Sequence, residues 1–269
     1  MATGMDDTRR VKAGEPATYV YCAVRAGRRP SLKRGLRGLP AAEPPRVLDI
    51  GEQLWLVVAT APVGQYGAAP IERRLQDLDW VSRCAMAHEA VIEDAARSGP
   101  VVPMKLFTLF SSDERAVAHI VRTRRKLARL FELVAGREEW GVRVSVDERV
   151  VASRRAEGSR PAKAASGTGF LLHKKAEKDA VRLAVEQALS EGERIFSELA
   201  GSAVDARRRT PVQSHTAIRV VLDAAFLVPL KQARTFRKAV AAQAKRRGDE
   251  YDITLTGPWP PYNFVSEPA

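Results

Sequence analysis

The segment 251–265 constrains the fold more than any other stretch, because it joins an alternating strand to a tail of prolines and aromatic rings. Its first six residues alternate between apolar and polar side chains, which is the period of a strand with one buried face. Proline has no N–H for a ladder hydrogen bond, so we expect Gly257 and Pro258 to end this strand. The sequence therefore predicts a half-buried strand over 251–256.

The tail after this strand carries three large rings, those of Trp259, Tyr262 and Phe264, among prolines whose φ angle is fixed. Disordered tails are normally poor in aromatic residues. We therefore expect an ordered, extended cap that packs on the body of the protein, with stiff prolines lowering the entropy lost on docking. A strip of the proline-rich type that recognises a partner is the functional alternative.

Length and composition are typical of a globular protein. The 269 residues suggest one large or two ordinary domains, and a hydrophobic share of 45% can supply a sizeable core. Lys and Arg exceed Asp and Glu by 44 to 32, a formal net charge of +12. This charge is compatible with nucleic acid, anionic membranes or acidic proteins as partners and does not discriminate among them.

The sequence does not indicate secretion or a membrane span. The first ten residues are polar and lack the apolar region of a signal peptide. The longest apolar run, 54–63, is too short to cross a bilayer. Cys22 and Cys84 lie in apolar patterns without metal-ligand spacing, which predicts buried free thiols in a reducing cytosol. We therefore expect a soluble cytoplasmic protein without membrane insertion.

The first half of the chain is predicted to combine strands with one helical region. Residues 1–16 are expected to form a disordered leader. Strands are predicted over 18–25, 46–50, 53–60 and 101–110, and the second and third of these form a hairpin. A helical region is expected over 70–97, and apolar residues at helical spacing should face the core. These residues are Leu78, Val81, Ala85, His88, Ile92 and Ala95.

A basic loop, residues 27–45, lies between the first two predicted strands. It carries five cations, Arg28, Arg29, Lys33, Arg34 and Arg37. A solvated loop is the plain interpretation. A loop that contacts an anion or a partner is the alternative, because loops carry function more often than their share of the chain.

The second half of the chain repeats the mixture of helices and strands. Ser111 and Glu114 have capping-box spacing and predict a helix over 111–135. The basic run 122–129 within it is expected to be a solvated face, with a nucleic-acid helix as the alternative. A strand over 139–146, a mobile loop over 153–169, a helix over 170–199, a strand over 216–228 and a helix over 229–247 follow. This pattern predicts an α+β chain of two domains.

His88 and Glu89 are the residues most easily mistaken for a catalytic motif. A zinc protease requires a second histidine four residues after the first, and Ile92 occupies that position. A buried, hydrogen-bonded histidine is the favoured interpretation. A hydrolase that uses His88 and Glu89 is a further hypothesis, and it predicts a pocket around both side chains. Neither a phosphate-cradling glycine loop nor a nucleophile elbow occurs in the sequence.

Several segments of the chain resemble, in the same order, the gas vesicle protein F/L family (GvpF/GvpL). They are the helix sequence HEAVIE from His88, the run VVPMKLFTLF from Val101, EWGVRV from Glu139, and TGPWPPYNFV from Thr256. The resemblance runs from about Tyr19 to Val265, nearly the whole chain. Lys105 stands where the family usually has arginine, and Phe107 where it usually has glycine.

The resemblance implies a fold and a function. The fold is α+β in two domains: a modified ferredoxin-like N-terminal domain over 17–110, and a C-terminal α+β domain over 111–269 with a small sheet and long helices, closed by the aromatic and proline tail. The function is that of a non-enzymatic accessory or minor structural protein of gas vesicles. It binds the small shell protein and other accessory proteins during assembly.

The same resemblance implies location and partners. The protein is expected in the cytoplasm and at the gas vesicle, without cofactor, metal, small-molecule substrate or specific nucleic acid. A basic nucleic-acid-binding module is the alternative function. The motif residues expected to have structural or partner-contact roles are His88, Glu89, Pro103, Met104, Lys105, Thr108, Trp140, Gly141, Gly257, Pro258, Trp259, Pro260, Pro261 and Tyr262.

Overall fold

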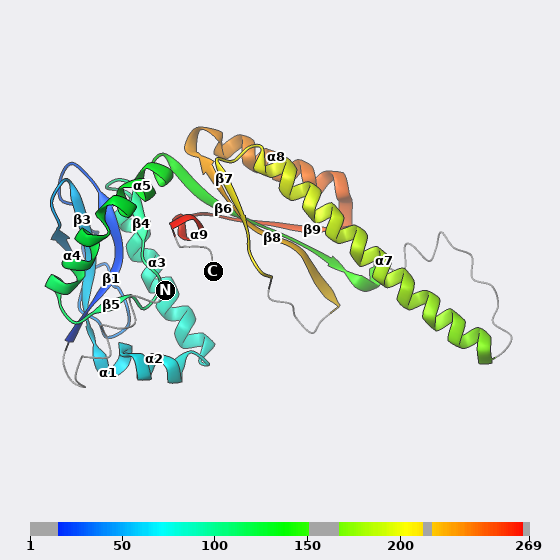
Figure 1. Cartoon of the computed structure of the whole chain (residues 1–269), viewed down its shortest axis with the longest axis horizontal. Helices are drawn as coiled ribbons and strands as arrows, with labels where there is room; N and C mark the ends of the chain where they lie inside the picture. Colours follow the sequence, from blue (N-terminus) through cyan, green and yellow to red (C-terminus); the bar gives the residue numbers. More distant parts are fainter. Residues whose placement is uncertain (1–15, 151–166, 212–216, 266–269) are drawn as a thin grey trace. The chain divides into compact units, whose positions relative to one another are not determined.

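The computed structural model describes residues 16–150, 167–211 and 217–265 (Figure 1). The predicted leader, apart from its last residue, and most of the predicted loop 153–169 lie outside the described residues. Helices combine with two antiparallel sheets, which confirms the α+β class. Contacts divide the chain into two compact units, residues 1–136 with 260–269, and residues 137–259. The ferredoxin-like description and the domain boundary at Phe110–Ser111 stay predictions.

The sheet of the first unit is built around its first strand. Its strands are β1 (Pro16–Arg25), β2 (Arg46–Asp49), β3 (Leu54–Pro62), β4 (Val101–Pro103) and β5 (Leu109–Phe110). The order is β2-β3-β1-β4, and β5 also pairs with β1. The predicted β2–β3 hairpin is confirmed, with Arg46 opposite Val58 and Asp49 opposite Trp55.

The prediction of one continuous strand over 101–110 is wrong. The strand is interrupted after Pro103, and the chain turns before β5 begins. Thr108 donates its backbone N–H to the Lys105 carbonyl at 3.1 Å, and Phe107 has a φ of +65°. Both pieces pair with β1, so the turn between them is held against the sheet.

Helices cover both faces of this sheet, which explains why β1 is apolar at almost every position. One face packs against α3 (Leu78–Ala96), which follows α1 (Val63–Tyr66) and α2 (Ala68–Arg74). The other face packs against α4 (Asp113–Arg122) and α5 (Arg124–Val134). Both cysteines are buried free thiols, as the sequence predicts.

The single helix predicted over 111–135 is two helices. The break is at Thr123, whose hydroxyl donates to the His119 and Ile120 carbonyls at 3.3 and 3.1 Å. Competition of this kind between a hydroxyl and the backbone is a common cause of bending. The cap is Ser112, one residue later than predicted, which accepts the Arg115 N–H at 3.3 Å.

The second unit is a four-stranded sheet with two helices on one face (Figure 1). Its strands are β6 (Arg137–Asp147), β7 (Asp205–Arg208), β8 (Ile218–Pro229) and β9 (Asp252–Trp259), in the order β7-β8-β6-β9. Helices α7 (Gly167–Ala200) and α8 (Ala233–Arg247) supply the covering apolar residues, and the short turns η2 (Leu230–Gln232) and η3 (Gly248–Glu250) flank α8. No helix of the described residues is long and apolar enough to span a membrane.

The prediction that Gly257 and Pro258 end the last strand is wrong, because β9 continues to Trp259. The pairing with β6 shifts between Glu139 and Gly141, so the proline lies at an irregularity of the ladder. The tail then forms α9 (Tyr262–Val265), one turn of helix instead of the extended cap expected. Tyr262 packs on the core of the first unit and Phe264 is buried, whereas Trp259 is 41% exposed.

Candidate interaction site

A hydrogen-bond network around His88 brings together three separate segments of the first unit. The Tyr19 hydroxyl lies 2.6 Å from His88 Nδ1, and His88 Nε2 lies 3.2 Å from the Met104 carbonyl oxygen. Because a carbonyl only accepts, Nε2 carries the proton and Nδ1 accepts from Tyr19. The Tyr19 oxygen in turn accepts the Phe107 N–H at 3.3 Å. We refer to these four residues as the His88 network.

Burial keeps this histidine neutral. Its side chain is only 3% exposed, with the Tyr21 ring stacked at 5.5 Å and the Tyr262 ring at 6.2 Å. Burial lowers the pKa of His88 to about 4, although its bond to the Met104 carbonyl acts in the opposite direction. The prediction of a buried, hydrogen-bonded histidine is confirmed. Both ring nitrogens are engaged, which argues against the hydrolase hypothesis.

The motif after Val101 builds the turn that receives His88. Pro103 is buried at the end of β4, and Met104 donates its N–H to the Tyr21 carbonyl at 2.9 Å. The Thr108 hydroxyl donates to the Lys105 carbonyl at 2.7 Å. These bonds leave the Met104 carbonyl free to accept from His88. The Lys105 side chain is exposed beside this turn.

A second group of motif residues lies in the other unit, where β6 meets β9. Gly141 is opposite Thr256, and a Cβ at Gly141 would come within 2.5 Å of the threonine hydroxyl. Gly257 has a φ of +116°, and a Cβ there would come within 2.8 Å of the Glu139 carbonyl oxygen. At Gly257 a side chain would clash with the backbone of β6, and at Gly141 it would displace the Thr256 side chain. Trp140 is buried in the core of this unit.

The motif residues thus form two groups, and the tail belongs to the first of them. The contacts assign the residues from Pro260 onward to the first unit. The sequence predicts that the tail belongs to the C-terminal domain. The tail ring of Tyr262 lies near Glu89: burial, with the nearby Glu89 carboxylate, raises the pKa of the Tyr262 phenol. Sequence reasoning missed Tyr19 and Phe107, because neither shows any local pattern that indicates a partner near His88.

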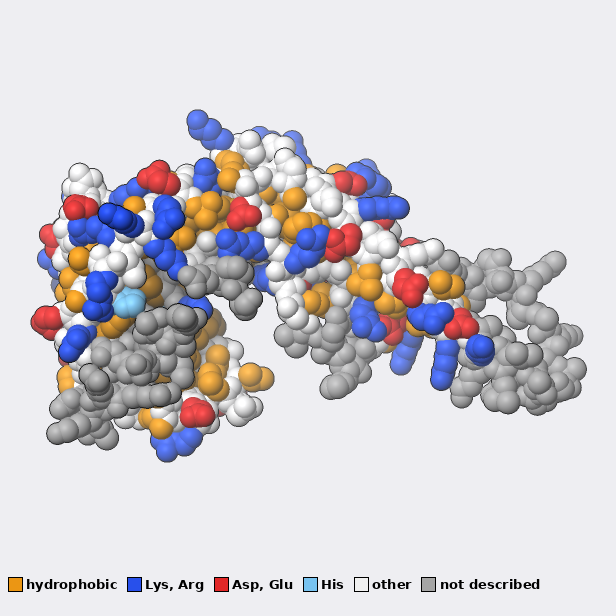
Figure 2. All heavy atoms as spheres, viewed as in Figure 1, with side chains coloured by type: hydrophobic (Ala, Val, Ile, Leu, Met, Phe, Trp, Pro, Cys, Tyr) orange, Lys and Arg blue, Asp and Glu red, His pale blue; other side chains and the backbone are white. Residues whose placement is uncertain are grey.

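The outer side of α3 exposes large apolar side chains. Leu78 is 75% exposed and Met86 72%, and Leu75, just before the helix, is 48% exposed. Ser82 and Ala85, both exposed, lie between them at helical spacing. We call these five residues the α3 stripe. Apolar side chains are visible near the junction of α2 and α3 (Figures 1 and 2).

The prediction that Leu78 and Ala85 face the core is wrong. Trp80, Cys84 and Val91 occupy the inward face instead, each no more than 2% exposed. The hydrogen bonds of His88 fix the rotation of the helix in this position. The stripe is therefore held outward by buried bonds on the opposite side, and exposed apolar residues of this kind commonly mark contact sites.

The run 207–209 is engaged within the protein, whereas Arg122 and Arg125 of the run 122–129 are exposed. Arg208 pairs with Glu193, and Arg209 donates to Asp223 at 2.7 Å. In the run 122–129, Arg124 pairs with Glu52 at 2.5 Å. On the face shown in Figure 2, Lys and Arg side chains are spread over many elements and mixed with acidic ones. This arrangement gives little support to a nucleic-acid surface.

The described residues offer no candidate metal centre. Within them, no group of three or more His, Cys, Asp or Glu side chains is placed to hold a metal ion. The arrangement instead combines a rigid buried network with an exposed apolar helix face. Such an arrangement is suited to binding another protein.

Comparison with known proteins gives one consistent result. The sequence model described as "Gas vesicle synthesis protein GvpL/GvpF" matches residues 17–266. Gas vesicle protein L of a Streptomyces species is 30% identical over 255 residues, covering 92% of each chain. Gas vesicle protein F of the same organism is 31% identical over 261 residues, covering 93% of this chain and 99% of its own.

Solved structures agree at the level of the fold. The crystal structure of GvpF from an Anabaena species superposes with a TM-score of 0.68 at 17% identity, covering 95% of this chain and 98% of that one. The crystal structure of GvpF from Microcystis aeruginosa gives a TM-score of 0.66 at 18% identity, covering 93% of this chain and 99% of that one.

Proposed function

The chain belongs to the gas vesicle GvpL/GvpF family, and from this premise we propose that it is a non-enzymatic assembly factor that binds the small shell protein of the vesicle. Membership of the family supports a role in gas vesicle formation. The finer proposal is that the protein also binds other accessory proteins, in the cytoplasm and at the growing vesicle.

The α3 stripe is the observation that carries this proposal. Its apolar side chains include a methionine, which adapts to irregular apolar partners. The stripe needs no rearrangement before it binds, because His88 holds the helix on its buried side. A helix with a fixed apolar face can shield an apolar subunit until it joins the shell.

Copurification tests the proposal directly. The tagged protein is expressed together with the shell protein, and the complex is purified and identified by mass spectrometry. We expect the shell protein to copurify, and cells that lack the gene to form few or no buoyant vesicles. Absence of the shell protein from the purified fraction, together with normal buoyancy of the deletion strain, would remove the proposal.

Fractionation of buoyant vesicles distinguishes two forms of the role. A protein that only delivers subunits stays in the soluble fraction, whereas a minor structural component floats with the vesicles. Stripping the vesicles with urea then separates an outer, loosely held component from one built into the shell. Each result assigns the place of the protein in the same assembly process.

A further inference from the structure

The loop between β1 and β2 forms an open surface hollow that neither the His88 network nor the α3 stripe uses. It has a volume of about 370 Å³, which is within the range of binding pockets. Leu32, Leu36, Pro44 and Pro45 give it apolar walls, and Lys33 and Arg37 are its charged residues. The basic loop 27–45 therefore forms a concave surface.

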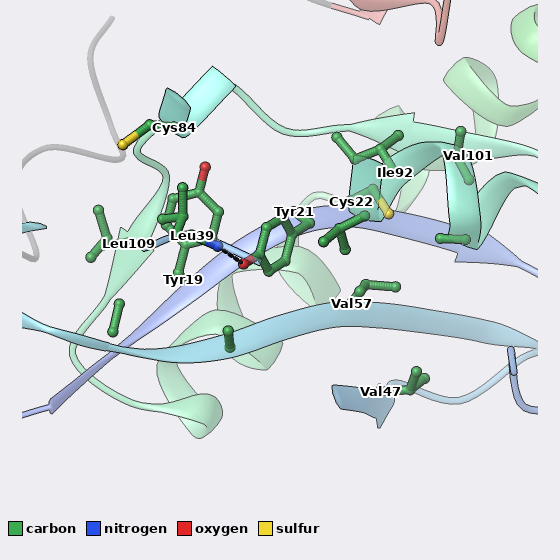
Figure 3. Packing of buried hydrophobic residues seen from close by; sticks show 14 of the residues in the cluster. Tyr19, Tyr21, Cys22, Leu39, Val47, Val57, Cys84, Ile92, Val101 and Leu109 are labelled. Atoms are coloured by element: carbon green, nitrogen blue, oxygen red, sulfur yellow. Dashed lines mark hydrogen bonds between the residues drawn. The ribbon is translucent and has the colours of Figure 1, made fainter. Parts of the chain in front are cut away.

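The loop is held in place at several points along its length. The backbone N–H of Lys33 donates to a carboxylate oxygen of Asp94 at 2.8 Å. The backbone N–H of Leu39 donates to the Tyr21 hydroxyl at 3.0 Å (Figure 3). The Tyr66 hydroxyl donates to the Pro40 carbonyl at 2.7 Å. A ligand of this hollow would not have to order the loop, and such preorganisation favours binding.

Close packing adds to this rigidity. A Cβ at Gly38 would come within 2.0 Å of the Tyr21 hydroxyl oxygen, so the backbone lies directly on that side chain. Leu39 is 2% exposed and belongs to the core of the first unit. Glu43 donates its N–H to the Thr60 carbonyl at 2.9 Å. The hollow is thus part of the folded body of the first unit.

The cations at this hollow lack acidic partners within the described part of the chain. No described carboxylate forms an ion pair with Lys33, Arg34 or Arg37. Asp94, which holds the loop, is buried and paired with Arg97, so its charge is already compensated. The mouth of the hollow therefore presents positive charge to solvent beside apolar walls.

We propose that this hollow binds an acidic peptide segment of a partner protein, with an apolar side chain between the leucines and prolines and carboxylates on Lys33 and Arg37. Arginine bonds carboxylates through two parallel N–H groups, and lysine adds a point charge. The exposed cations of the hollow favour an acidic partner. Among the residues that the structure describes, no aromatic ring lines the hollow for base stacking, which makes a single-stranded nucleic acid the weaker fit.

This inference goes beyond shell-protein binding, and it uses a different surface of the first unit. The α3 stripe lies on one side of a helix and is mainly apolar, whereas the loop combines apolar walls with the cations Lys33 and Arg37 around a hollow. The two sites can be occupied by different proteins, or by two segments of one protein. The two sites are tested with different variants. A negative result at one site therefore leaves the proposal for the other site standing.

Fluorescence anisotropy with a labelled synthetic peptide tests the site on the full-length protein. The probe carries two leucines set among glutamates. One comparison peptide replaces the glutamates by glutamines, and a second replaces the leucines by serines. We expect both comparison peptides to bind at least about tenfold more weakly, since each loses one half of the recognition.

A pair of matched double variants assigns the site. Lys33→Gln with Arg37→Gln removes two charges from the hollow, and Arg122→Gln with Arg125→Gln removes two exposed charges elsewhere on the first unit. We expect the first pair to weaken the peptide at least about tenfold and the second less than about twofold. The midpoint of thermal unfolding should be the same for both, because none of these side chains is buried.

Three results would overturn the proposal. One is absence of peptide binding at millimolar protein concentration. Another is an equal loss in the two double variants, which would show that only net charge matters. The third is binding of a single-stranded oligonucleotide that is tighter than the peptide and equally dependent on Lys33 and Arg37, which would assign the hollow to phosphate.

Discussion

The hydroxyl of Tyr19 donates to Nδ1 of His88 across 2.6 Å, and it joins the central strand of the first unit to helix α3. The two residues are 69 positions apart in the sequence. Both are buried, so neither can exchange its partner for water. Because His88 also donates to the Met104 carbonyl, one side chain sets the position of a helix, a strand and a turn.

Removal of the Tyr19 hydroxyl should destabilise the first unit. Tyr19→Phe leaves His88 Nδ1 and the Phe107 N–H without their partner, and a buried group left unsatisfied costs about 1–3 kcal/mol. Urea unfolding followed by circular dichroism measures the change. Tyr251→Phe is the matched control, because the Tyr251 ring is only partly buried. Equal stability of the two variants would contradict the role of the network.

Acid should destabilise the protein through His88. The pKa of His88 is lowered to about 4 by burial, from an ordinary value near 6.5. The unfolded chain therefore binds the proton more readily than the folded one between these values, and stability falls as pH falls through this window. The full difference corresponds to about 3 kcal/mol. His88→Asn should show a shallower pH dependence from pH 6.5 to 4.

NMR spectroscopy of the histidine ring checks the same shift directly. The His88 signal should keep its neutral position at pH 6, where an exposed histidine is already more than half protonated. A signal that titrates with a midpoint near 6.5 would show that the ring is accessible to water. That result would also reopen the question of acid–base chemistry at this residue.

A methyl group at Gly141 should disturb the pairing of β6 with β9. Gly141→Ala places a Cβ within 2.5 Å of the Thr256 hydroxyl, and overpacking of this kind costs about 1–3 kcal/mol. Amide hydrogen exchange in β9 should become faster. Gly64→Ala is the control, because a Cβ there meets nothing within 4 Å. Unchanged exchange in the Gly141 variant would show that the Thr256 side chain moves aside and the pairing of the strands is kept.

Polar substitution on the α3 stripe should weaken partner binding without unfolding the protein. Leu78→Ser with Met86→Ser removes two exposed apolar side chains, and burial of such side chains is worth about 1.5–3 kcal/mol each at a contact. We expect at least a tenfold loss in copurified shell protein. Val121→Ser with Leu230→Ser changes exposed apolar residues elsewhere and should have no effect. Equal effects of the two pairs would move the contact away from α3.

DNA titration tests the remaining alternative. If the net charge of +12 served nucleic-acid binding, affinity would fall steeply with salt. We expect weak binding that disappears near physiological salt, because Arg208 and Arg209 are paired within the protein. Tight binding that persists in salt, and that Arg122→Gln and Arg125→Gln abolish, would favour a nucleic-acid module instead.

Local patterns in the sequence predicted the elements better than their contacts. The β2–β3 hairpin, the long helix α7 and the α+β class follow from periodicity and turn residues, which depend on neighbours in the chain. Which side of α3 faces the core does not follow from these local patterns, since apolar residues occur on more than one side of the helix. Trp80 and Cys84 turn inward because the sheet offers them a matching surface, which no local pattern contains.

At the candidate site, too, local features could be predicted from the sequence but long-range contacts could not. His88 was recognised as buried and hydrogen-bonded, but its partners come from strands far away in the sequence. The turn at Phe107 interrupts a run that reads as one strand, because its backbone bonds are satisfied only by β1 and the neighbouring turn. The tail was identified as ordered from its rings. Its place on the first unit follows from topology, which a single sequence does not reveal.

The return of the chain to the first unit at Pro260 has a consequence for synthesis on the ribosome. Translation finishes residues 1–136 early, yet Tyr262 and Phe264 emerge only after every residue of the second unit. Until then the nascent first unit lacks the Tyr262 side chain, which packs against its core. A stop codon within the second unit would therefore leave the first unit without its last segment.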